Sequence, residues 1–386
     1  MFIHMLTTLQ ENKFMFFIFI LLTYYLMKQG VNPEIFANKD VITYLPNPRR
    51  FKLKTMTYNV FGRWCNLTGK EGQTERLSAM PRSIYKHALL GPDIDIITLN
   101  ELWCPDAQFG KIVCGNDRSG DIIIKKMAKY GWKYHTQVLC SLGAPLFKKQ
   151  TGGGCIIFSK WPIVSVRRHL YKSCSGGDCC ASKGIVYARI LKKLENGMNQ
   201  PINVFVTHLQ AWPSYKEDLV REQQLEELRY DFMYDIDIPK NRSEIVLFQG
   251  DFNTENTDML ENKLDATLPV LIGPQKYSYD AATNILVGKD GMAGYLGCGD
   301  VYRKTLKCPC CPGYLLDYIF YSKNPFYMKP TTSTMQVVPL KSTKTLNFEM
   351  DMNTNIFLRF FDRKTVKIKT KELSDHYPVV ANFIFN

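Results

Sequence analysis

Polar side chains that could bind a metal ion or transfer a proton follow apolar runs at several separate places in this sequence. The clearest case is "FQGDFNT" (248–254), where Asp251 and Asn253 stand two residues apart after an apolar run. Asp and Asn favour turns because their side chains hydrogen-bond nearby backbone groups, so a plain turn is the default interpretation of this stretch alone. A carboxylate and an amide also suit a divalent cation, which prefers oxygen ligands. The rest of the chain must decide between the two.

Comparable side chains stand at the ends of other predicted strands. Each one alone has a structural interpretation, as a turn residue or a hydrogen-bonded histidine. Asp317, inside "LLDYIFY", fits that interpretation least, because a buried carboxylate without a partner is costly and a histidine would be a suitable partner. Ligand and catalytic groups gather where the strands of a sheet emerge on one side. We therefore expect one site to contain Asn59, Glu101, His208, Asp251, Asn253, Asp317, Asp375 and His376.

Short apolar or alternating runs bounded by Gly, Pro or Asn predict the strands that carry these residues. Ser214 and Glu217 form a capping box, which predicts the start of a helix. A second helix is expected over residues 73–90, where Pro81 bends the helix or delays its start. The predicted strands cover residues 53–61, 93–102, 154–163, 202–209, 244–250, 315–322 and 377–385.

Composition limits the class of protein. The chain of 386 residues is 45% hydrophobic and 13% aromatic, which excludes a disordered chain and allows a sizeable core. We find no repeat or low-complexity segment after residue 50, so we expect one α/β domain over residues 51–386. The formal net charge of +13 favours an anionic partner, either nucleic acid or a phospholipid surface. Charge alone does not choose between them.

The N-terminal segment predicts entry into the secretory pathway. Residues 14–27 are almost wholly apolar, and this length is short for a transmembrane helix but fits the apolar region of a secretory signal. Ala37 is a tolerable cleavage site, so residues 1–37 are expected to be a signal peptide or a retained signal-anchor, with residues 38–50 as a linker. The protein would then be secreted or anchored to a membrane. Twelve cysteines agree with an oxidising compartment, where disulfides persist.

The cysteines near residue 310 raise the question of a zinc site. Tetrahedral zinc sites space their ligands in pairs two to four residues apart, and "CPCC" (308–311) is too crowded for that pattern. Disulfides are the better interpretation in a secreted chain, although their connectivity cannot be deduced from sequence.

The whole ordered set resembles the sphingomyelinase C family within the endonuclease/exonuclease/phosphatase (deoxyribonuclease I-like) superfamily. "GDFN" and "SDH" are shared across that superfamily, whereas "SKWPI", "SKG" and "THLQA" point to the sphingomyelinase branch. The matching motifs run in family order, as "GQTERL" (72–77), "LNEL" (99–102), "GGGCIIFSKWPI" (152–163), "GGDCCASKGIVYARI" (176–190), "THLQA" (207–211), "GDFN" (250–253), "YSYDAATN" (277–284), "YLLDYIFYSKNP" (314–325) and "LSDHYPV" (373–379).

The resemblance implies an α/β fold, a four-layer sandwich of two mixed β-sheets flanked by helices. It also implies metal-dependent hydrolysis of sphingomyelin to ceramide and phosphocholine, with lysophosphatidylcholine and related choline lipids as further candidate substrates. The cofactor would be Mg²⁺, with Mn²⁺ as the alternative. A hard cation held by oxygen ligands neutralises the phosphate and orients the attacking water. Glu101 is the first choice of ligand, and the other expected ligands are Asn59, Asp251, Asn253 and Asp375.

The same resemblance assigns catalytic roles. His376 would take the proton of the attacking water, and Asp317 would fix the tautomer of that histidine. His208 would contact the phosphate or protonate the departing oxygen, which matters because ceramide leaves as a strongly basic alkoxide. Asp251 and Asn253 complete the expected catalytic set.

The loop "GGDCCASKG" (176–184) adds Asp178 and Lys183 as expected substrate-binding residues. In the sphingomyelinase branch, an Asp and a Lys at this spacing couple loop position to substrate binding and catalysis. The structural alternative is a turn Asp and a solvated lysine. Cys179 and Cys180 depart from the family pattern and place the geometry of this loop in question.

A membrane contact is expected just before the "SDH" motif. Between Lys341 and Lys371, eight Lys or Arg residues stand against three acids. Secreted sphingomyelinases have a hairpin with exposed aromatic residues at this place, which here implies membrane contact by Phe357, Phe360 and Phe361. Flanking basic residues would attract the protein to anionic lipids. The alternative is that these aromatics belong to the core.

Two other functions use the same features. A secreted metal-dependent nuclease would share the metal and histidine set and the basic charge, but nucleic acid is not the expected partner of a chain with sphingomyelinase-type motifs. A non-enzymatic membrane-binding protein would show gaps in the catalytic set, and none is found at the motif positions. A monomeric enzyme acting on a choline lipid in a membrane is the favoured interpretation.

Overall fold

Strand β1 (Phe51–Gly62) shows why the chain folds in layers. Its alternate residues Met56, Tyr58 and Val60 pack with apolar residues of two helices in one buried cluster. The residues between them point the other way, and Asn59 reaches across to hydrogen-bond Asp251 of a second sheet. Successive side chains of a strand point to opposite faces, so one strand contacts both a helix layer and another sheet. The computed structural model describes residues 50–62, 72–103, 119–139, 151–240, 242–287, 313–351 and 365–386.

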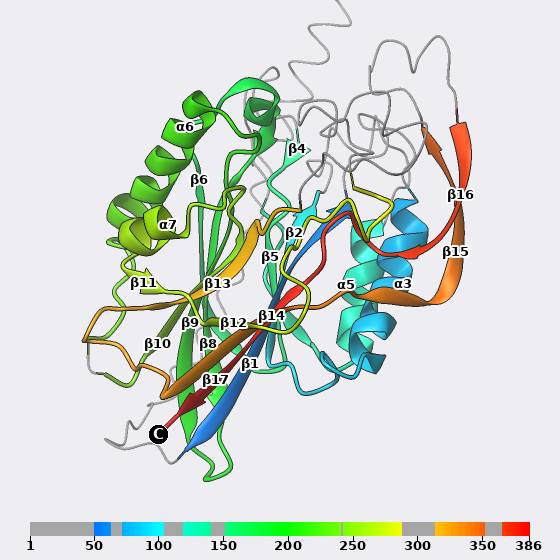
Figure 1. Ribbon diagram of the computed structural model, residues 1–386. Coiled ribbons are helices and arrows are strands. Elements are labelled where there is room, and N and C mark those ends of the chain that lie inside the picture. The colour runs from blue at the N-terminus through cyan, green and yellow to red at the C-terminus, as the bar shows by residue number, and fades with distance from the viewer. Residues whose placement is uncertain are drawn as a thin grey trace, which may run out of the picture. The chain divides into compact units, whose positions relative to one another are not determined.

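Two mixed sheets form the centre of the molecule (Figure 1). The seven-stranded sheet consists, in spatial order, of β12 (Val270–Ile272), β14 (Thr332–Val337), β17 (Val379–Phe385), β1, β2 (Ile96–Leu102), β5 (Ile156–Ser159) and β3 (Tyr134–His135). The six-stranded sheet consists of β11 (Ala266–Thr267), β13 (Asp317–Ser322), β10 (Ile245–Asp251), β9 (Asn199–His208), β8 (Gly184–Lys193) and β6 (Ile163–Leu170). Two further ribbons pair β15 (Lys341–Asp351) with β16 (Thr365–Glu372), and β4 (Thr151–Gly152) with β7 (Ala181–Ser182).

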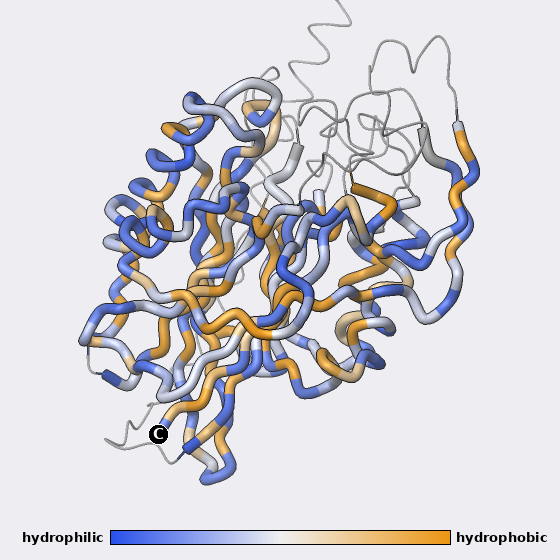
Figure 2. The backbone as a smooth tube through the Cα atoms, in the orientation of Figure 1, coloured by the Kyte–Doolittle hydropathy of each residue, from blue (hydrophilic) through white to orange (hydrophobic). Residues whose placement is uncertain are grey.

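Helices cover the outer face of each sheet. In Figure 1, α3 (Gln73–Lys86) and α5 (Ser119–Lys129) lie beyond the seven-stranded sheet. On the other side, α6 (Tyr215–Glu226), its π-helical continuation η2 (Glu227–Phe232) and α7 (Thr257–Leu264) lie beyond the six-stranded sheet. Figure 2 shows hydrophobic residues concentrated along the strands between these layers. The predicted four-layer α/β sandwich is confirmed.

All seven predicted strands are present, with shifted ends. The prediction over 154–163 merged β5 with the start of β6, because a bend at Lys160–Pro162 separates two short apolar runs. The helix expected over 73–90 ends at Lys86, and Pro81 lies inside it. Ser214 caps α6 as predicted, since its hydroxyl accepts a hydrogen bond from the backbone N–H of Glu217.

Each large sheet contains a parallel pair of strands whose ends carry expected site residues. β1 runs parallel to β2, and β9 runs parallel to β10. The carboxyl ends of parallel strands emerge on the same edge of a sheet, so four strand ends meet on one side of the molecule. The expected residues at these ends are Asn59, Glu101, His208 and Asp251.

The β15–β16 hairpin stands apart from both sheets, at the edge of Figure 1 beside α3. In the second half of β15, Phe348 packs in a small buried cluster with Phe61 and Leu286. The expected membrane-contact residues Phe357, Phe360 and Phe361 lie outside the described residues, as do the N-terminal segment and "CPCC". Within the described ranges, no helix is long and apolar enough to cross a membrane.

Candidate active site

Three of the expected site residues form one row across the six-stranded sheet. Asp251, the last residue of β10, is paired in register with His208 of β9 on one side and with Asp317 of β13 on the other. The site is therefore built on rigid strand ends rather than on loop tips. Asp317 is fully buried, as expected for a residue in the middle of an apolar stretch.

A histidine–aspartate pair stands at one end of this row. His376 Nδ1 lies 2.7 Å from Asp317 Oδ2, so the carboxylate accepts the Nδ1 proton and leaves Nε2 facing the site. Burial alone would lower the pKa of His376, but the carboxylates of Asp317, Asp375 and Asp251 outweigh it and hold that pKa well above its ordinary value. The partner that the sequence required for Asp317 is thus His376.

Asp251 occupies the centre. Its Oδ2 accepts a hydrogen bond from Asn59 Nδ2 at 2.9 Å and lies 3.7 Å from His208 Nε2 and 3.9 Å from His376 Nε2. Its Oδ1 accepts a hydrogen bond from the backbone N–H of Asn253 at 2.9 Å. Burial, and then the charge of the neighbouring Asp317, raise the pKa of Asp251 to about 7. The "GDFN" turn (250–253) is therefore a turn that also directs the Asp251 carboxylate into a buried polar centre.

His208 faces Asp251 from β9 and is buried. Burial lowers the pKa of His208 well below its ordinary value, and the charges of Lys183 and His376 lower it further. Its Nδ1 has no hydrogen-bond partner among the described residues. A neutral imidazole in this position can donate one N–H to an anion, and this agrees better with the expected phosphate contact than with the alternative role as a charged acid.

Glu101 lies across the seam between the two sheets and has a buried oxygen that could bind a cation. Its Oε1 accepts from Asn59 Nδ2 at 3.2 Å, while its buried Oε2 has no partner in the part of the chain that the structure describes. The residue has a left-handed backbone, with φ of 55°. Gly154 packs directly on that backbone, since an added Cβ would come within 2.8 Å of Glu101 Cα. A buried carboxylate oxygen without a partner fits a bound cation, because burying it alone is costly.

The remaining expected ligands, Asn59, Asn253 and Asp375, differ in the hydrogen bonds that their side chains already make. Asn59 Oδ1 accepts from the backbone N–H of Phe61 at 3.1 Å, so this amide directs its nitrogen, not its oxygen, toward the two carboxylates. Asn253 Nδ2 donates to Leu209 O at 3.0 Å. Asp375 is buried and accepts from Ser374 Oγ at 3.2 Å. A ligand role for Asn59 would require its amide to turn.

A second grouping could also hold a cation. Asp251, Asp317 and His376 place ligand atoms within 4.8 Å of one another. Two of the three, however, are already joined by the His376–Asp317 hydrogen bond, which an ion between them would break. Glu101 Oε2 and Asp317 Oδ1 both lack a partner among the described residues, but only a cation on the Glu101–Asp251 side leaves the His376–Asp317 hydrogen bond intact, so that side is the better cation position.

The loop with Asp178 and Lys183 is tied down at the edge of the site. Lys183 Nζ donates to Asp178 Oδ2 at 2.6 Å and to Leu209 O at 2.8 Å, and Lys183 is only 5% exposed. Lys183 is thus not the solvated lysine of the structural alternative. Asp178 Oδ2 also accepts from the backbone N–H of Ala211 at 2.7 Å. A disulfide joins Cys174 to Cys179 and closes a small ring around Asp178.

Helix α6 braces this loop in a way that the sequence did not reveal. Gln210 exchanges hydrogen bonds with the backbone of Ser175, and Gln224 of α6 accepts from the backbone N–H of Gln210. Arg221, also on α6, donates to Gln210 O and Trp212 O. Gln210 lies inside the "THLQA" motif, which was the available signal.

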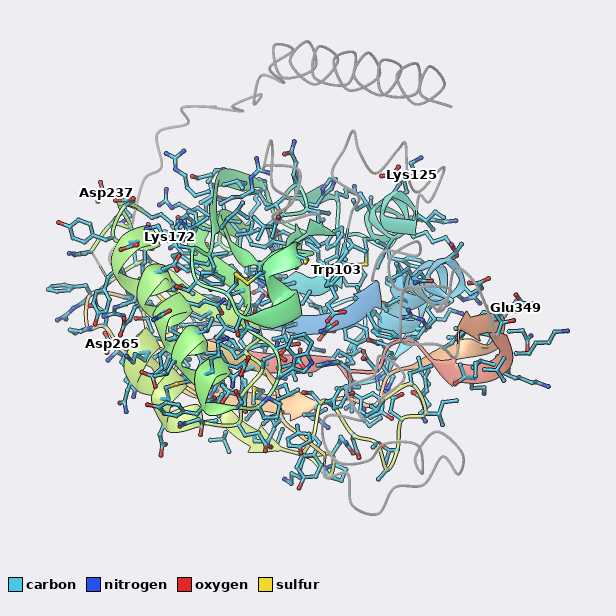
Figure 3. All side chains as sticks on the ribbon, turned by 90° about the horizontal axis from the view of Figure 1, so that it is seen from above. Trp103, Lys125, Lys172, Asp237, Asp265 and Glu349 are labelled. Carbon is cyan, nitrogen blue, oxygen red and sulfur yellow. A yellow bond between two sulfur atoms is a disulfide. The ribbon has the colours of Figure 1, made fainter. Side chains whose placement is uncertain are left out.

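The "YSYDAATN" segment supports the histidine–aspartate pair and was also missed. Ser278 Oγ accepts from the backbone N–H groups of Leu316 and Asp317 at 3.0 and 3.2 Å. The Tyr279 ring lies 5.1 Å from the His376 ring, centroid to centroid. The segment therefore supports His376 and its partner Asp317. Figure 3 shows the molecule from above. Trp103, two residues beyond Glu101, lies near the middle of that view.

Comparison with known proteins gives the same picture. The chain is 28% identical over 343 residues to a sphingomyelinase C from Bacillus cereus, an alignment that covers 85% of this chain and 88% of that one. It is 30% identical over 354 residues to a sphingomyelinase C from Leptospira interrogans, covering 88% of this chain but only 52% of that longer protein. The sphingomyelinase C resemblance found from the sequence motifs is confirmed.

Solved structures share the fold. A beta toxin mutant from Staphylococcus aureus with bound magnesium ions aligns with a TM-score of 0.63 at 24% identity, covering 86% of this chain and 99% of that one. A sphingomyelinase C from Streptomyces griseocarneus aligns with a TM-score of 0.63 at 20% identity, again over 86% and 99%. The family model described as "Endonuclease/Exonuclease/phosphatase family" matches residues 56–376, so the chain belongs to the endonuclease/exonuclease/phosphatase family.

Proposed function

We propose that this protein is a metal-dependent phosphodiesterase that hydrolyses sphingomyelin to ceramide and phosphocholine. The observation that carries the proposal is the convergence of the hydrogen-bonded His376–Asp317 pair with Asp251 and His208, since the Nε2 atoms of His208 and His376 lie 3.7 and 3.9 Å from Asp251 Oδ2. Relatives named sphingomyelinase C supply the substrate class. Lysophosphatidylcholine and related choline lipids are further candidate substrates.

The described residues divide the reaction between the two sheets. Glu101, with its partnerless oxygen, and Asp251 would hold Mg²⁺ or Mn²⁺. A bound divalent cation supplies charge neutralisation at the phosphate and orients a water. The magnesium in the structure of the related beta toxin supports Mg²⁺ as the first candidate.

His376 is the proposed base. Asp317 accepts its Nδ1 proton, so Nε2 is the atom that takes the proton of the attacking water. Asp251 Oδ2, 3.9 Å from Nε2, is placed to hold that water between them. Asn253 fixes the other oxygen of Asp251 through its backbone N–H.

His208 and the Asp178–Lys183 pair act on the phosphate side. Neutral His208 donates a hydrogen bond to a phosphate oxygen or to the departing oxygen. Lys183 already donates to Asp178 and Leu209 O, which leaves one N–H for the substrate. Asp178 thereby controls where the lysine charge lies.

The direct test is release of phosphocholine from vesicles of sphingomyelin, lysophosphatidylcholine or phosphatidylcholine, with EDTA and with added Mg²⁺ or Mn²⁺. We expect sphingomyelin cleavage that EDTA abolishes and metal restores. His376→Ala is the matched control for contaminating activity. Cleavage of DNA but of no choline lipid would replace the proposal by the nuclease alternative.

We propose further that the protein acts as a monomer at membrane surfaces in the secretory pathway. The Cys174–Cys179 disulfide supports an oxidising compartment. Exposed lysines on the hairpin, including Lys367 and Lys369, support attraction to anionic lipid.

The hairpin tip is proposed to enter the lipid through Phe357, Phe360 and Phe361. Replacing Phe360 and Phe361 together by Ala should reduce activity on bilayers and spare a short, water-soluble choline phosphodiester. Lys369→Ala tests the charge on the same hairpin separately, since Phe360 and Phe361 carry none. Loss of both activities with a lowered melting temperature would show that the pair belongs to the core.

A further inference from the structure

A buried arginine outside the active site hydrogen-bonds backbone carbonyl groups of the segments that carry active-site residues. Arg76, in the first turn of α3, is fully buried. Its Nη1 donates to Val60 O at 3.1 Å and to Leu373 O at 2.8 Å, and its Nη2 donates to Phe61 O at 2.6 Å. One guanidinium thus joins two stretches of chain, Val60–Phe61 and Leu373, that lie more than 300 residues apart in sequence.

Both stretches carry catalytic groups. Val60 directly follows Asn59, and Leu373 begins the "LSDH" motif that contains His376. A second contact joins the same two stretches, since Ser374 Oγ donates to Asn59 O at 2.7 Å. Arg76 therefore fixes the end of β1 relative to the segment that places the base.

Phe61 extends this arrangement to the side chain of Asn59. The Arg76 guanidinium lies 5.0 Å from the centre of the Phe61 ring, a cation–π distance. Phe61 has a left-handed backbone with φ of 48°, and its N–H donates to Asn59 Oδ1. That hydrogen bond decides which end of the Asn59 amide faces Asp251 and Glu101. The orientation of Asn59 thus depends on a residue that Arg76 holds by both backbone and ring.

We propose that Arg76 is a positioning residue for the catalytic centre, acting through Asn59 and the 373–376 segment. A planar guanidinium can hold three carbonyl groups in one fixed geometry, which neither lysine nor an apolar side chain can do. The proposal rests on the proposed phosphodiesterase function but not on the identity of the lipid.

The test compares kcat and KM of Arg76→Ala and Arg76→Lys on sphingomyelin vesicles and on bis(p-nitrophenyl) phosphate, corrected for the folded fraction. Arg189 is the control, because it is a largely buried arginine that pairs with Glu244 at the opposite end of the sheet. We expect kcat of Arg76→Ala to fall at least tenfold with KM within about twofold, and methylguanidine to restore part of it. Arg189→Ala should lose stability, keep its kcat when folded, and show no rescue.

The proposal is overturned if folded Arg76→Ala keeps the wild-type kcat, or if methylguanidine restores nothing. If Arg76→Ala does not fold, Arg76→Lys decides, and a wild-type kcat in that variant overturns the proposal. If the wild type cleaves the soluble diester but not sphingomyelin, the proposed lipid substrate is wrong. The proposed role of Arg76 is then tested on the soluble diester. If wild type cleaves neither, the side-chain ¹⁵N shifts of His376 remain a readout: they should change in Arg76→Lys and not in Arg189→Lys, and an absence of change overturns the proposal.

Discussion

Strands β2 and β10 each have a carboxylate at both ends, and the carboxylates at the two ends differ in their hydrogen-bond partners. At the starting ends, Asp95 accepts from Lys192 Nζ at 2.5 Å and Trp161 Nε1 at 2.7 Å, and Glu244 accepts from Arg189 Nη2 at 2.5 Å and Asn203 Nδ2 at 2.8 Å. At the finishing ends, by contrast, Glu101 keeps a buried oxygen without a partner among the described residues, and Asp251 has a pKa raised to about 7.

The contrast separates structure from function. Asp95 and Glu244, 4% and 0% exposed, are neutralised by basic side chains of the protein itself. Glu101 and Asp251 receive neutral amide hydrogens instead of a basic side chain at hydrogen-bonding distance, which leaves charge for a cation or a substrate to satisfy. In these two strands a buried carboxylate paired with a basic side chain is a structural element, whereas one that receives only amide hydrogens indicates a site.

The largest expected effect is at the finishing ends. His376→Ala and Asp251→Ala should each lower phosphocholine release by about 10²–10⁴-fold, because general-base catalysis and the held water are lost. Far-UV circular dichroism and the melting temperature should show that both variants remain folded. Near-normal turnover by well-folded His376→Ala would refute the proposed mechanism.

At the starting ends of the strands we expect a loss of stability without a loss of turnover. Glu244→Ala leaves Arg189 partly buried without its carboxylate, which should cost about 3–5 kcal/mol of unfolding free energy. Turnover per folded molecule should stay within about twofold of wild type. Urea unfolding followed by activity at low urea checks both quantities. A large loss of turnover in the folded protein would break the distinction between the two ends.

A smaller effect is expected at Glu101, the proposed metal ligand, than at the proposed base. Glu101→Gln removes the ligand charge but keeps the shape, so the Mg²⁺ concentration for half-maximal activity should rise at least about tenfold. Asp95→Asn is the matched control and should leave this concentration unchanged. An unchanged metal titration for Glu101→Gln would rule out Glu101 as a ligand.

The smallest effect is a shift in pH dependence. The base must be neutral to accept a proton, and the raised pKa of His376 predicts that activity is lost as pH falls through a value above its ordinary 6.5. Asp317 stabilises the imidazolium, so removing its charge in Asp317→Asn should lower that pKa. The acid limb of kcat/KM should then move to lower pH by about one unit, with a lower plateau. A limb that stays in place would mean that another group controls it.

The sequence predicted which polar residues come together better than it predicted the contacts that surround them. Asp317 could be identified because a carboxylate inside an apolar strand requires a partner, and His376 is that partner. The layered fold followed from the family motifs. The supporting contacts of Ser278, Gln210 and Arg76 could not be predicted, because polar side chains that satisfy backbone groups leave no periodic pattern in sequence. The amide orientation of Asn59 likewise depends on the left-handed backbone of Phe61, which composition does not reveal.

The seam between the sheets has a consequence for how the protein would lose activity. No backbone ladder joins the two large sheets to each other in the described chain, so the distance from Asn59 and Glu101 to Asp251 and His208 depends on side-chain packing and on side-chain hydrogen bonds such as Asn59–Asp251. In a swollen, molten-globule-like state the strands would persist while the packing between sheets loosens. Turnover should therefore disappear together with the near-UV circular dichroism signal and well before the far-UV signal. Enzymatic activity in this protein would then measure how tightly the two sheets pack against each other.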